Sequence, residues 1–187
     1  MASANEKLLN SAGEVAGKRV VLVNANSSNL LPQRHWGAEN FRALIEMLLG
    51  YRNDILVLLT GVQSERMELE RLRCRVNSER CLNVAGVLEF HELPALYALS
   101  TCMVTNDSGP AHFAAVTSLP TYVLFGPETP DLYGPLGSAI PIYARFHCSP
   151  CVSAWNHRKS PCQDNKCLQV ITPEAVFEKV KSVLDRS

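Results

Sequence analysis

Short apolar runs alternate with amphipathic segments along most of the chain, and this alternation limits the fold more than any other feature. The stretches KRVVLVN and DILVLLT have the continuous apolar centres VVLV and ILVLL, which are typical of parallel strands buried on both faces. Strands are expected at residues 18–24, 54–60, 81–85, 102–105, 121–125 and 140–144. Helices are expected at 38–50 (ended by Gly50), 64–76, 93–100, 113–116 (buried) and from Thr172-Pro173-Glu174 onward. The pattern predicts an α/β domain with a parallel sheet and helices on both faces.

Length and charge narrow the class of protein further. The chain has 187 residues, with 18 basic and 18 acidic side chains, which is enough for one domain with a sizeable core. The balanced charge argues against a protein that binds nucleic acid through bulk charge. No apolar run approaches the ~20 residues that span a bilayer, and residues 1–18 lack the apolar core of a signal peptide. We therefore expect a cytoplasmic protein with a flexible tail or linker remnant at 1–18 and one domain at 19–187.

A strand that turns through Asp107-Ser108-Gly109 into a helix is typical of an anion site. The first amides of such a helix point at the turn, and the helix dipole favours negative charge there. Gly109 lets the backbone approach a ligand closely, and Pro110 suits the first helical turn. His112 is expected to face the same pocket, whereas Asp107 would repel a phosphate and is expected to bind a hydroxyl or a backbone amide. The alternative is that Asp107 or Ser108 only caps the helix.

Four of the seven cysteines lie in the polar, turn-rich segment 147–167, namely Cys148, Cys151, Cys162 and Cys167. The first two are separated by two residues, a spacing that favours zinc over a disulfide in a cytosolic protein. The second two are separated by four residues, which is at the long end of the usual spacing. A structural zinc ion is one expectation, and free thiols or disulfides are the alternatives.

Further motifs follow the anion turn in sequence. A buried strand ends in Gly126-Pro127, and Tyr133-Gly134-Pro135 comes soon after. Together, the stretch TNDSGPAHFAAVTSLPTYVLFGPETPDLYGP resembles the donor-binding half of glycosyltransferase family 9, the lipopolysaccharide heptosyltransferase family. The resemblance runs from about residue 20 to the C-terminus, with several motifs in the family's order. It implies a Rossmann-like domain equivalent to the C-terminal half of a GT-B glycosyltransferase, which is one of that family's two domains.

The resemblance also implies where a nucleotide-activated sugar, most simply an ADP-linked one, binds. After the first strand, a small polar loop with Ser27 and Ser28 precedes Arg34. Arg34 stands where the family has a lysine that contacts the donor phosphates, and it keeps the charge while changing the geometry. Gly37 stands where the family has a proline. The alternative is that Arg34 is a solvated surface arginine.

Two more strand ends complete the implied donor site. Where the family often has an acidic residue after the second strand, Gln63 is the first candidate to accept from ribose hydroxyls and Glu65 the second. Glu65 equally suits the first turn of a helix, where the dipole favours a carboxylate. Val87 or Leu88 borders the nucleotide base, although ordinary core packing is the alternative for both. By resemblance, the diphosphate and the donor sugar are held by Asp107, Ser108, Gly109 and His112.

The implied reaction is inverting transfer of heptose to a lipopolysaccharide core or a related glycolipid acceptor. Helix amides, Arg34 and a protonated His112 would stabilise the leaving phosphate, and the sequence has no Asp-x-Asp pair, so transfer is expected to need no metal. The acceptor site and the catalytic base belong to the family's N-terminal domain, so no catalytic residue is assigned. That domain is an expected partner, in the same or another chain, and peripheral attachment to the inner membrane is expected.

Two other classes of function compete with this interpretation. A non-catalytic module that binds a nucleotide or a nucleotide sugar is the main alternative. A dinucleotide-dependent oxidoreductase is disfavoured, because no Gly-x-Gly-x-x-Gly follows the first strand.

Overall fold

A six-stranded parallel sheet forms the centre of the domain, with strand order β3-β2-β1-β4-β5-β6. The computed structural model describes residues 6–7, 15–26, 31–157 and 159–186. The strands are β1 (Arg19–Asn24), β2 (Ile55–Leu59), β3 (Cys81–Asn83), β4 (Cys102–Asn106), β5 (Thr121–Phe125) and β6 (Ala139–Tyr143). The chain runs outward from β1 to β3 and then returns to β4 on the other side of β1, so the strand order reverses between β1 and β4.

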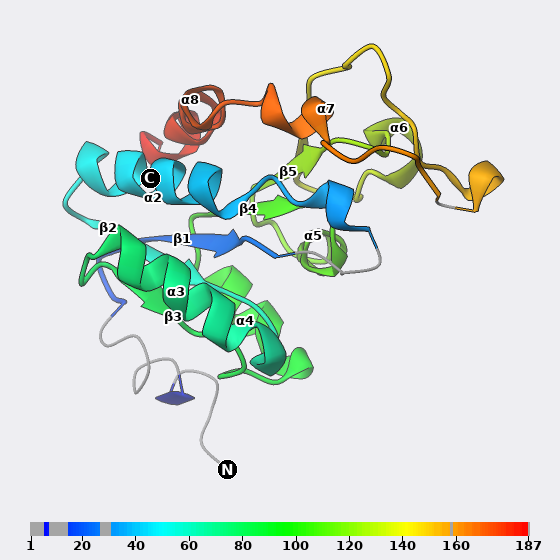
Figure 1. Ribbon diagram of the computed structural model, residues 1–187. Coiled ribbons are helices and arrows are strands. Elements are labelled where there is room, and N and C mark those ends of the chain that lie inside the picture. Colours follow the sequence, from blue (N-terminus) through cyan, green and yellow to red (C-terminus); the bar gives the residue numbers. More distant parts are fainter. Residues whose placement is uncertain (1–5, 8–14, 27–30, 158, 187) are drawn as a thin grey trace.

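Helices cover both faces of this sheet, as the continuous apolar strands require. They are α2 (Ala38–Tyr51), α3 (Arg66–Val76), α4 (Leu93–Ala98), α5 (Gly109–Ala114), α6 (Pro130–Tyr133), α7 (Lys166–Gln169) and α8 (Pro173–Leu184). Short 3-10 turns are η1 (Pro32–Arg34), η2 (Gln63–Glu65), η3 (Phe90–Glu92) and η4 (Ala154–Asn156). Figure 1 shows α2 and α8 side by side on one face of the sheet. Within the described residues, no helix has the length and apolar character needed to cross a bilayer.

Two apolar clusters lie on the two faces of the sheet. The larger one joins α2, α3 and α8 to the strands, and includes the fully buried Phe41, Leu44 and Val180. The smaller one joins α4 and α5 to the opposite face, and includes Leu96 and Met103. Burial on both faces confirms the predicted α/β fold with a parallel sheet.

The ends of the expected elements agree with the structure in most places. All six expected strands are present, each within about two residues of its predicted bounds. The last helix begins as predicted, because the Thr172 hydroxyl accepts a hydrogen bond from the Ala175 amide at 3.3 Å. The prediction that Gly50 ends the helix that begins at Ala38 is wrong, since α2 continues to Tyr51. The Tyr51 ring packs edge-on against Phe177 at 5.5 Å, and this contact keeps the last turn helical.

The prediction that 113–116 forms a buried helix is also wrong in part. The helix α5 begins earlier and ends at Ala114, and only Ala111 and Ala114 are buried in it. Phe113 is 41% exposed and Val116 is 79% exposed. The reason is that the short helix α5 packs on β4 and β5 through its small side chains, which leaves Phe113 on its outer side.

Most of the expected tail, 1–18, lies outside the described residues. Within the described part, Lys7 pairs with Glu92 at 2.8 Å, and Val15 packs against the smaller cluster. The domain therefore contacts at least part of this segment.

We predict that Gly126→Ala lowers the free energy of unfolding by about 1–3 kcal/mol, the usual cost of overpacking. A Cβ on Gly126 would lie 2.5 Å from Cγ of the fully buried Leu168 in α7. Gly50→Ala is the matched control, because a Cβ there meets no described atom within 4 Å and a helical alanine gains up to about 1 kcal/mol. Urea unfolding of both variants measures the difference, and equal stabilities would contradict the packing role of Gly126.

Candidate functional site

A pocket of about 460 Å³ opens at the carboxyl ends of the strands, where the strand order reverses between β1 and β4. Ligands of open α/β sheets bind at this edge and at this reversal. Its wall comprises Asn24, Asn26, Thr60, Gly61, Val62, Gln63, Glu65, Gly86, Leu88, Glu89, Phe90, Leu93, Tyr97, Ser108, Gly109, Pro110 and Phe113. The volume falls in the range of small-molecule sites.

The pocket is lined by both apolar and polar residues. Phe90 and Phe113 meet edge to face, with ring centroids 4.5 Å apart, and both are substantially exposed. Tyr97 is buried beside them, and its burial raises the pKa to about 12, so the phenol stays uncharged at neutral pH. The polar part of the lining holds amide, hydroxyl and carboxylate groups, including those of Gln63 and Ser108. Such a combination suits a ligand with a flat apolar ring and a hydroxylated or anionic part.

Gln63 and Gly86 approach each other closely at the pocket wall. Gly86 has a φ of +72°, and a Cβ on it would lie 2.9 Å from the Gln63 Cα. The Gly86 amide donates to the Gly61 carbonyl at 3.0 Å. Glu65 lines the same pocket, and its carboxylate accepts from the Val62 amide at 2.8 Å, which stabilises the turn η2. Gln63 is therefore held at the pocket wall, and Glu65 has a structural role there as well.

The turn at Ser108-Gly109 places the start of α5 against the pocket. Ser108 occupies the N-cap position, but its side chain makes no capping hydrogen bond within the described part of the chain. The Ser108 hydroxyl instead donates to the Asn106 carbonyl at 3.1 Å and lies 3.2 Å from the Thr105 hydroxyl. The interpretation of Ser108 as a simple cap is wrong, because the strand end binds its hydroxyl and leaves the helix amides uncapped by it.

A buried charge cluster lies at the same sheet edge. The Arg34 side chain is only 12% exposed and donates through Nη2 to Glu128 Oε2. Arg34 Nε lies 3.7 Å from Asp107 Oδ2, and Nη1 donates to the Asp107 carbonyl at 3.4 Å. Glu128 is fully buried and Asp107 is 4% exposed. Two carboxylates therefore flank one guanidinium, and the alternative of a solvated Arg34 is wrong.

The loop that carries Arg34 is fixed by several buried hydrogen bonds. Trp36 Nε1 donates to the Ile171 carbonyl at 2.7 Å, and the Trp36 amide donates to Asn106 Oδ1 at 3.1 Å. Asn106 Nδ2 donates to the Ala25 carbonyl at 2.8 Å. These contacts tie the end of β1 to β4 and to the chain before α8, so the position of Arg34 is set by the core.

The residues proposed from sequence divide into separate groups. Gln63, Leu88, Ser108 and Gly109 line the pocket, together with the second candidate Glu65. Arg34 and Asp107 form the buried charge cluster beside it. His112 is exposed on α5 and is not part of the pocket wall. Val87 packs against the smaller core, and Ser27 and Ser28 lie outside the described residues.

Three further polar residues at this edge, Glu128, Asn24 and Asn26, were not among the site residues expected from the sequence. Glu128 follows the Gly-Pro at the end of β5, and Asn24 and Asn26 lie at and just after the end of β1. Asn24 Nδ2 donates to the Thr60 carbonyl at 2.9 Å and so joins the ends of β1 and β2. The sequence feature that could have identified these three residues is their common position at or just after strand ends, on the sheet edge where ligands bind.

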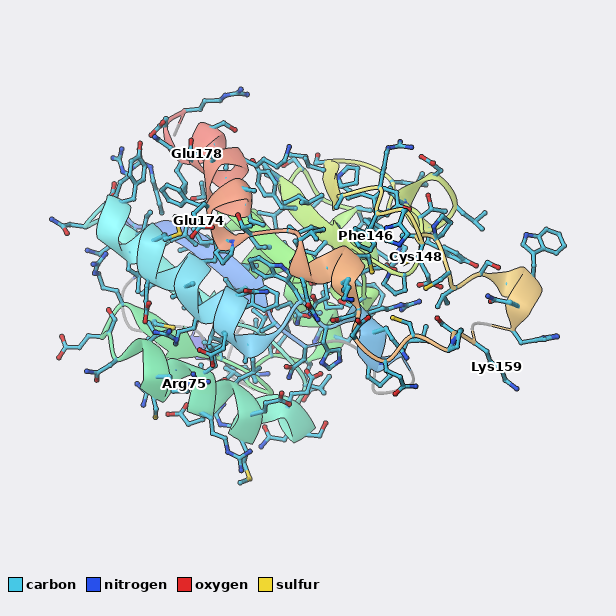
Figure 2. All side chains as sticks on the ribbon, turned by 45° about the horizontal axis from the view of Figure 1, so that its top comes forward. Arg75, Phe146, Cys148, Lys159, Glu174 and Glu178 are labelled. Atoms are coloured by element: carbon cyan, nitrogen blue, oxygen red, sulfur yellow. The ribbon has the colours of Figure 1, made fainter. Side chains whose placement is uncertain are left out.

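The cysteine-rich loop packs against the loop of Arg34. Gln33 Nε2 donates to the Cys162 carbonyl at 3.1 Å, and Asn165 Nδ2 donates to the His35 carbonyl at 2.8 Å. Figure 2 shows Cys148 near the body of the domain and Lys159 at the outer end of the same loop. The cysteine-rich loop therefore packs against the loop of Arg34 and supports one side of the charge cluster.

The four clustered cysteines are free thiols in the structure. Cys167 is buried, and this burial, with the nearby Cys151 and Cys148, raises its pKa to about 11. Among the described residues, no three His, Cys, Asp or Glu side chains are arranged to hold one metal ion. The zinc site stays a prediction.

We predict that Glu128→Gln lowers the free energy of unfolding by about 1–3 kcal/mol, because the buried guanidinium loses a charged partner. Asp107 remains beside Arg34 and limits the loss. Glu46→Gln removes an exposed partner of Arg42 and should change stability by no more than about 0.5 kcal/mol. Thermal and urea unfolding of both variants decide, and a neutral Glu128→Gln would show that the buried pair contributes nothing.

The chain is similar to bacterial heptosyltransferases in sequence. Lipooligosaccharide heptosyltransferase 2 of Haemophilus influenzae is 29% identical over 173 residues, which cover 90% of this chain and 48% of that protein. Lipopolysaccharide heptosyltransferase 2 of Escherichia coli is 28% identical over 163 residues, which cover 82% and 43%. The chain spans about half the length of the curated relatives it matches.

Solved structures share the fold. The E. coli ADP-heptose lps heptosyltransferase II has a TM-score of 0.76 at 23% identity, and the match covers 100% of this chain and 53% of that chain. The E. coli heptosyltransferase WaaC with ADP has a TM-score of 0.65 at 21% identity, covering 96% and 48%. The iron-containing dodecameric glycosyltransferase TibC of E. coli has a TM-score of 0.64 at 14% identity, covering 92% and 47%.

These structures confirm the expected Rossmann-like α/β fold, with a parallel sheet like that of one half of the matched transferases. The family model described as glycosyltransferase family 9 (heptosyltransferase) matches residues 2–161. The chain belongs to glycosyltransferase family 9.

Proposed function

We propose that this chain is the donor-binding domain of a heptosyltransferase-like glycosyltransferase and that the 460 Å³ pocket takes an ADP-activated sugar. The observation that carries this proposal is the position of the pocket. It lies at the reversal of strand order, and its lining combines aromatic rings with polar side chains, as a nucleotide requires. The structure of E. coli WaaC with ADP, which has the same fold, supports the choice of nucleotide.

Each part of the donor has a matching part of the pocket. The base packs on the apolar wall of Leu88, Phe90 and Phe113, since a flat ring buries apolar surface there. Ribose hydroxyls donate to Gln63 at the pocket wall. The diphosphate lies at the Ser108-Gly109 turn, which lines the pocket at the start of α5.

Transfer builds negative charge on the leaving diphosphate. Amides at the start of α5 and the guanidinium of Arg34 stabilise this charge electrostatically. Arg34 is already flanked by Asp107 and Glu128, so the net charge of this cluster is negative. In this proposal, the guanidinium of Arg34 acts as a fixed positive charge oriented next to the diphosphate. The reaction in this proposal inverts the anomeric centre and uses no metal ion.

The acceptor half completes the enzyme. The chain covers about half of its relatives, so the acceptor domain and the catalytic base lie in the remaining half, in the same or another chain. The acceptor is a lipopolysaccharide or a related glycolipid, which would bring the enzyme to the cytoplasmic side of the inner membrane. Alone, this domain binds donor and does not transfer. The competing function, a non-catalytic nucleotide-sugar module, predicts no transfer after an acceptor half is added.

We predict that calorimetry detects binding of ADP and of ADP-sugars by this domain. We also predict that Asp107→Asn weakens binding of the nucleotide sugar by about 1.5–3 kcal/mol and leaves binding of ADP unchanged. A charged acceptor for sugar hydroxyls is lost in this variant while the shape is kept. Asp185→Asn, which changes an exposed carboxylate beside the far end of α2, is the control. Absence of heat with ADP at millimolar concentration overturns the donor site. Unchanged affinity for the nucleotide sugar overturns the role of Asp107 alone.

We also propose that the four clustered cysteines bind one structural zinc ion, as their spacing suggests. Protein purified without added metal should then contain about one zinc per chain, and Cys148→Ser with Cys151→Ser should remove it. Cys81→Ser is the control, because Cys81 is buried in the core away from this loop. Iron is measured in the same samples, because the structural relative TibC is an iron-containing glycosyltransferase. A folded protein without any metal overturns the site, and mass spectrometry then distinguishes thiols from disulfides.

A further inference from the structure

A second cavity of about 180 Å³ lies beside the donor pocket, between the start of α2 and the side of α3. Its wall comprises Ala25, Asn26, His35, Gly37, Ala38, Glu68, Leu69, Arg71, Leu72 and Arg75. Figure 2 labels Arg75 on α3, next to the ribbon of α2. Asn26 lines both cavities, so it forms part of the partition between them. The proposed donor residues Gln63, Leu88, Ser108 and Gly109 are not part of the second wall.

Asn26 presents an unpaired donor at this wall. The residue is 6% exposed, and its Nδ2 is buried without a hydrogen-bond partner among the described residues. A buried amide N–H is costly to leave unpaired, so it indicates a missing acceptor. An amide nitrogen can only donate, and therefore the ligand must offer an oxygen or a similar acceptor.

The start of α2 adds further donors. Gly37 is its N-cap residue, and no side chain in the described ranges caps this terminus. The first intrahelical hydrogen bond runs from the Phe41 amide to the Gly37 carbonyl at 3.2 Å. The amides of residues 38–40 come before this bond and therefore have no acceptor within the helix. The helix has 14 residues, and its dipole places partial positive charge at this end.

Side-chain charge favours an anion in the same place. Arg71 and Arg75 from α3 line the cavity, and Arg71 makes no ion pair with any residue of the described part. Arg75 pairs with Glu39 in the first turn of α2, and Glu39 also pairs with Arg42 at 3.2 Å. Glu68 is the one carboxylate in the wall as far as the chain is described, and it is exposed to solvent. The wall therefore holds two guanidinium groups and one carboxylate, and Glu39 outside the wall offsets the charge of Arg75, which leaves Arg71 as the cation available to an anion.

We propose that this cavity binds a small oxyanion, a phosphate or carboxylate group, held by Asn26 Nδ2, the amides at the start of α2 and the guanidinium of Arg71. The volume admits one such group and excludes a nucleotide. The anion is either free or carried by a sugar, and the chemistry of recognition is the same for both. The site stands apart from the proposed donor pocket and does not depend on that assignment.

Titration of ¹⁵N-labelled protein with inorganic phosphate at constant ionic strength tests the site. We expect saturable chemical-shift changes at the Asn26 side-chain amide and at the amides of residues 38–40, with sodium chloride as the control. The same changes should persist when ADP is present. If ADP fails to bind, the donor assignment fails while the phosphate result stands. Absence of change at these amides up to about 50 mM phosphate overturns the proposal, since even a millimolar site would be filled.

Two variants locate the binding. Arg71→Gln should weaken phosphate binding on the order of fivefold through loss of a charged donor. Arg186→Gln is the matched control, because it removes the same charge near the opposite end of α2, where Asp185 meets Tyr51. Asn26→Asp should abolish binding by adding a carboxylate to the wall. If that variant fails to fold, Arg71→Gln still decides, and equal affinities of Arg71→Gln and Arg186→Gln overturn the proposal.

A second titration distinguishes the two sources of the anion. Glucose 6-phosphate that binds more tightly than inorganic phosphate supports an anionic sugar as the occupant. Glucose 6-phosphate that binds more weakly supports a free anion. Shift changes confined to residues outside the cavity wall, with either compound, overturn the site.

Discussion

One buried guanidinium connects the strand ends on which the candidate site is built. Arg34, after β1, lies between Asp107, after β4, and Glu128, after β5. Charges removed from water are tolerated only when they are paired and hydrogen-bonded, so each of these side chains requires the others. These ion pairs hold the loop of Arg34 against the ends of β4 and β5 at the carboxyl edge of the sheet.

The same cluster sets an electrostatic condition for any anionic ligand. Two carboxylates against one guanidinium leave a net negative charge, which opposes a diphosphate placed directly on Arg34. At the start of α5, Ser108 and Gly109 line the pocket and carry no such charge, while Pro110 has no amide proton and the Ala111 amide donates to the Ser108 carbonyl at 3.1 Å. In the proposed donor site, a diphosphate is therefore expected nearer to the Ser108-Gly109 turn than to Arg34.

Most of the sheet could be predicted from sequence, because strands buried on both faces are continuous apolar runs that local pattern reveals. The end of α2 beyond Gly50 and the exposure of Phe113 depend on distant packing partners, which a periodicity does not contain. Glu128 was missed for the same reason, since its partner Arg34 is 94 residues away in the chain. Ser108 and Gly109 were found because a strand, a turn and a helix start are adjacent in sequence.

The second cavity and the proposed donor pocket share one wall residue, Asn26. Asn26 borders both spaces, so a ligand that fixes its amide on one side alters the wall on the other. Coupling between two sites is reciprocal, and a bound anion that favours the donor must itself be favoured by the donor to the same extent.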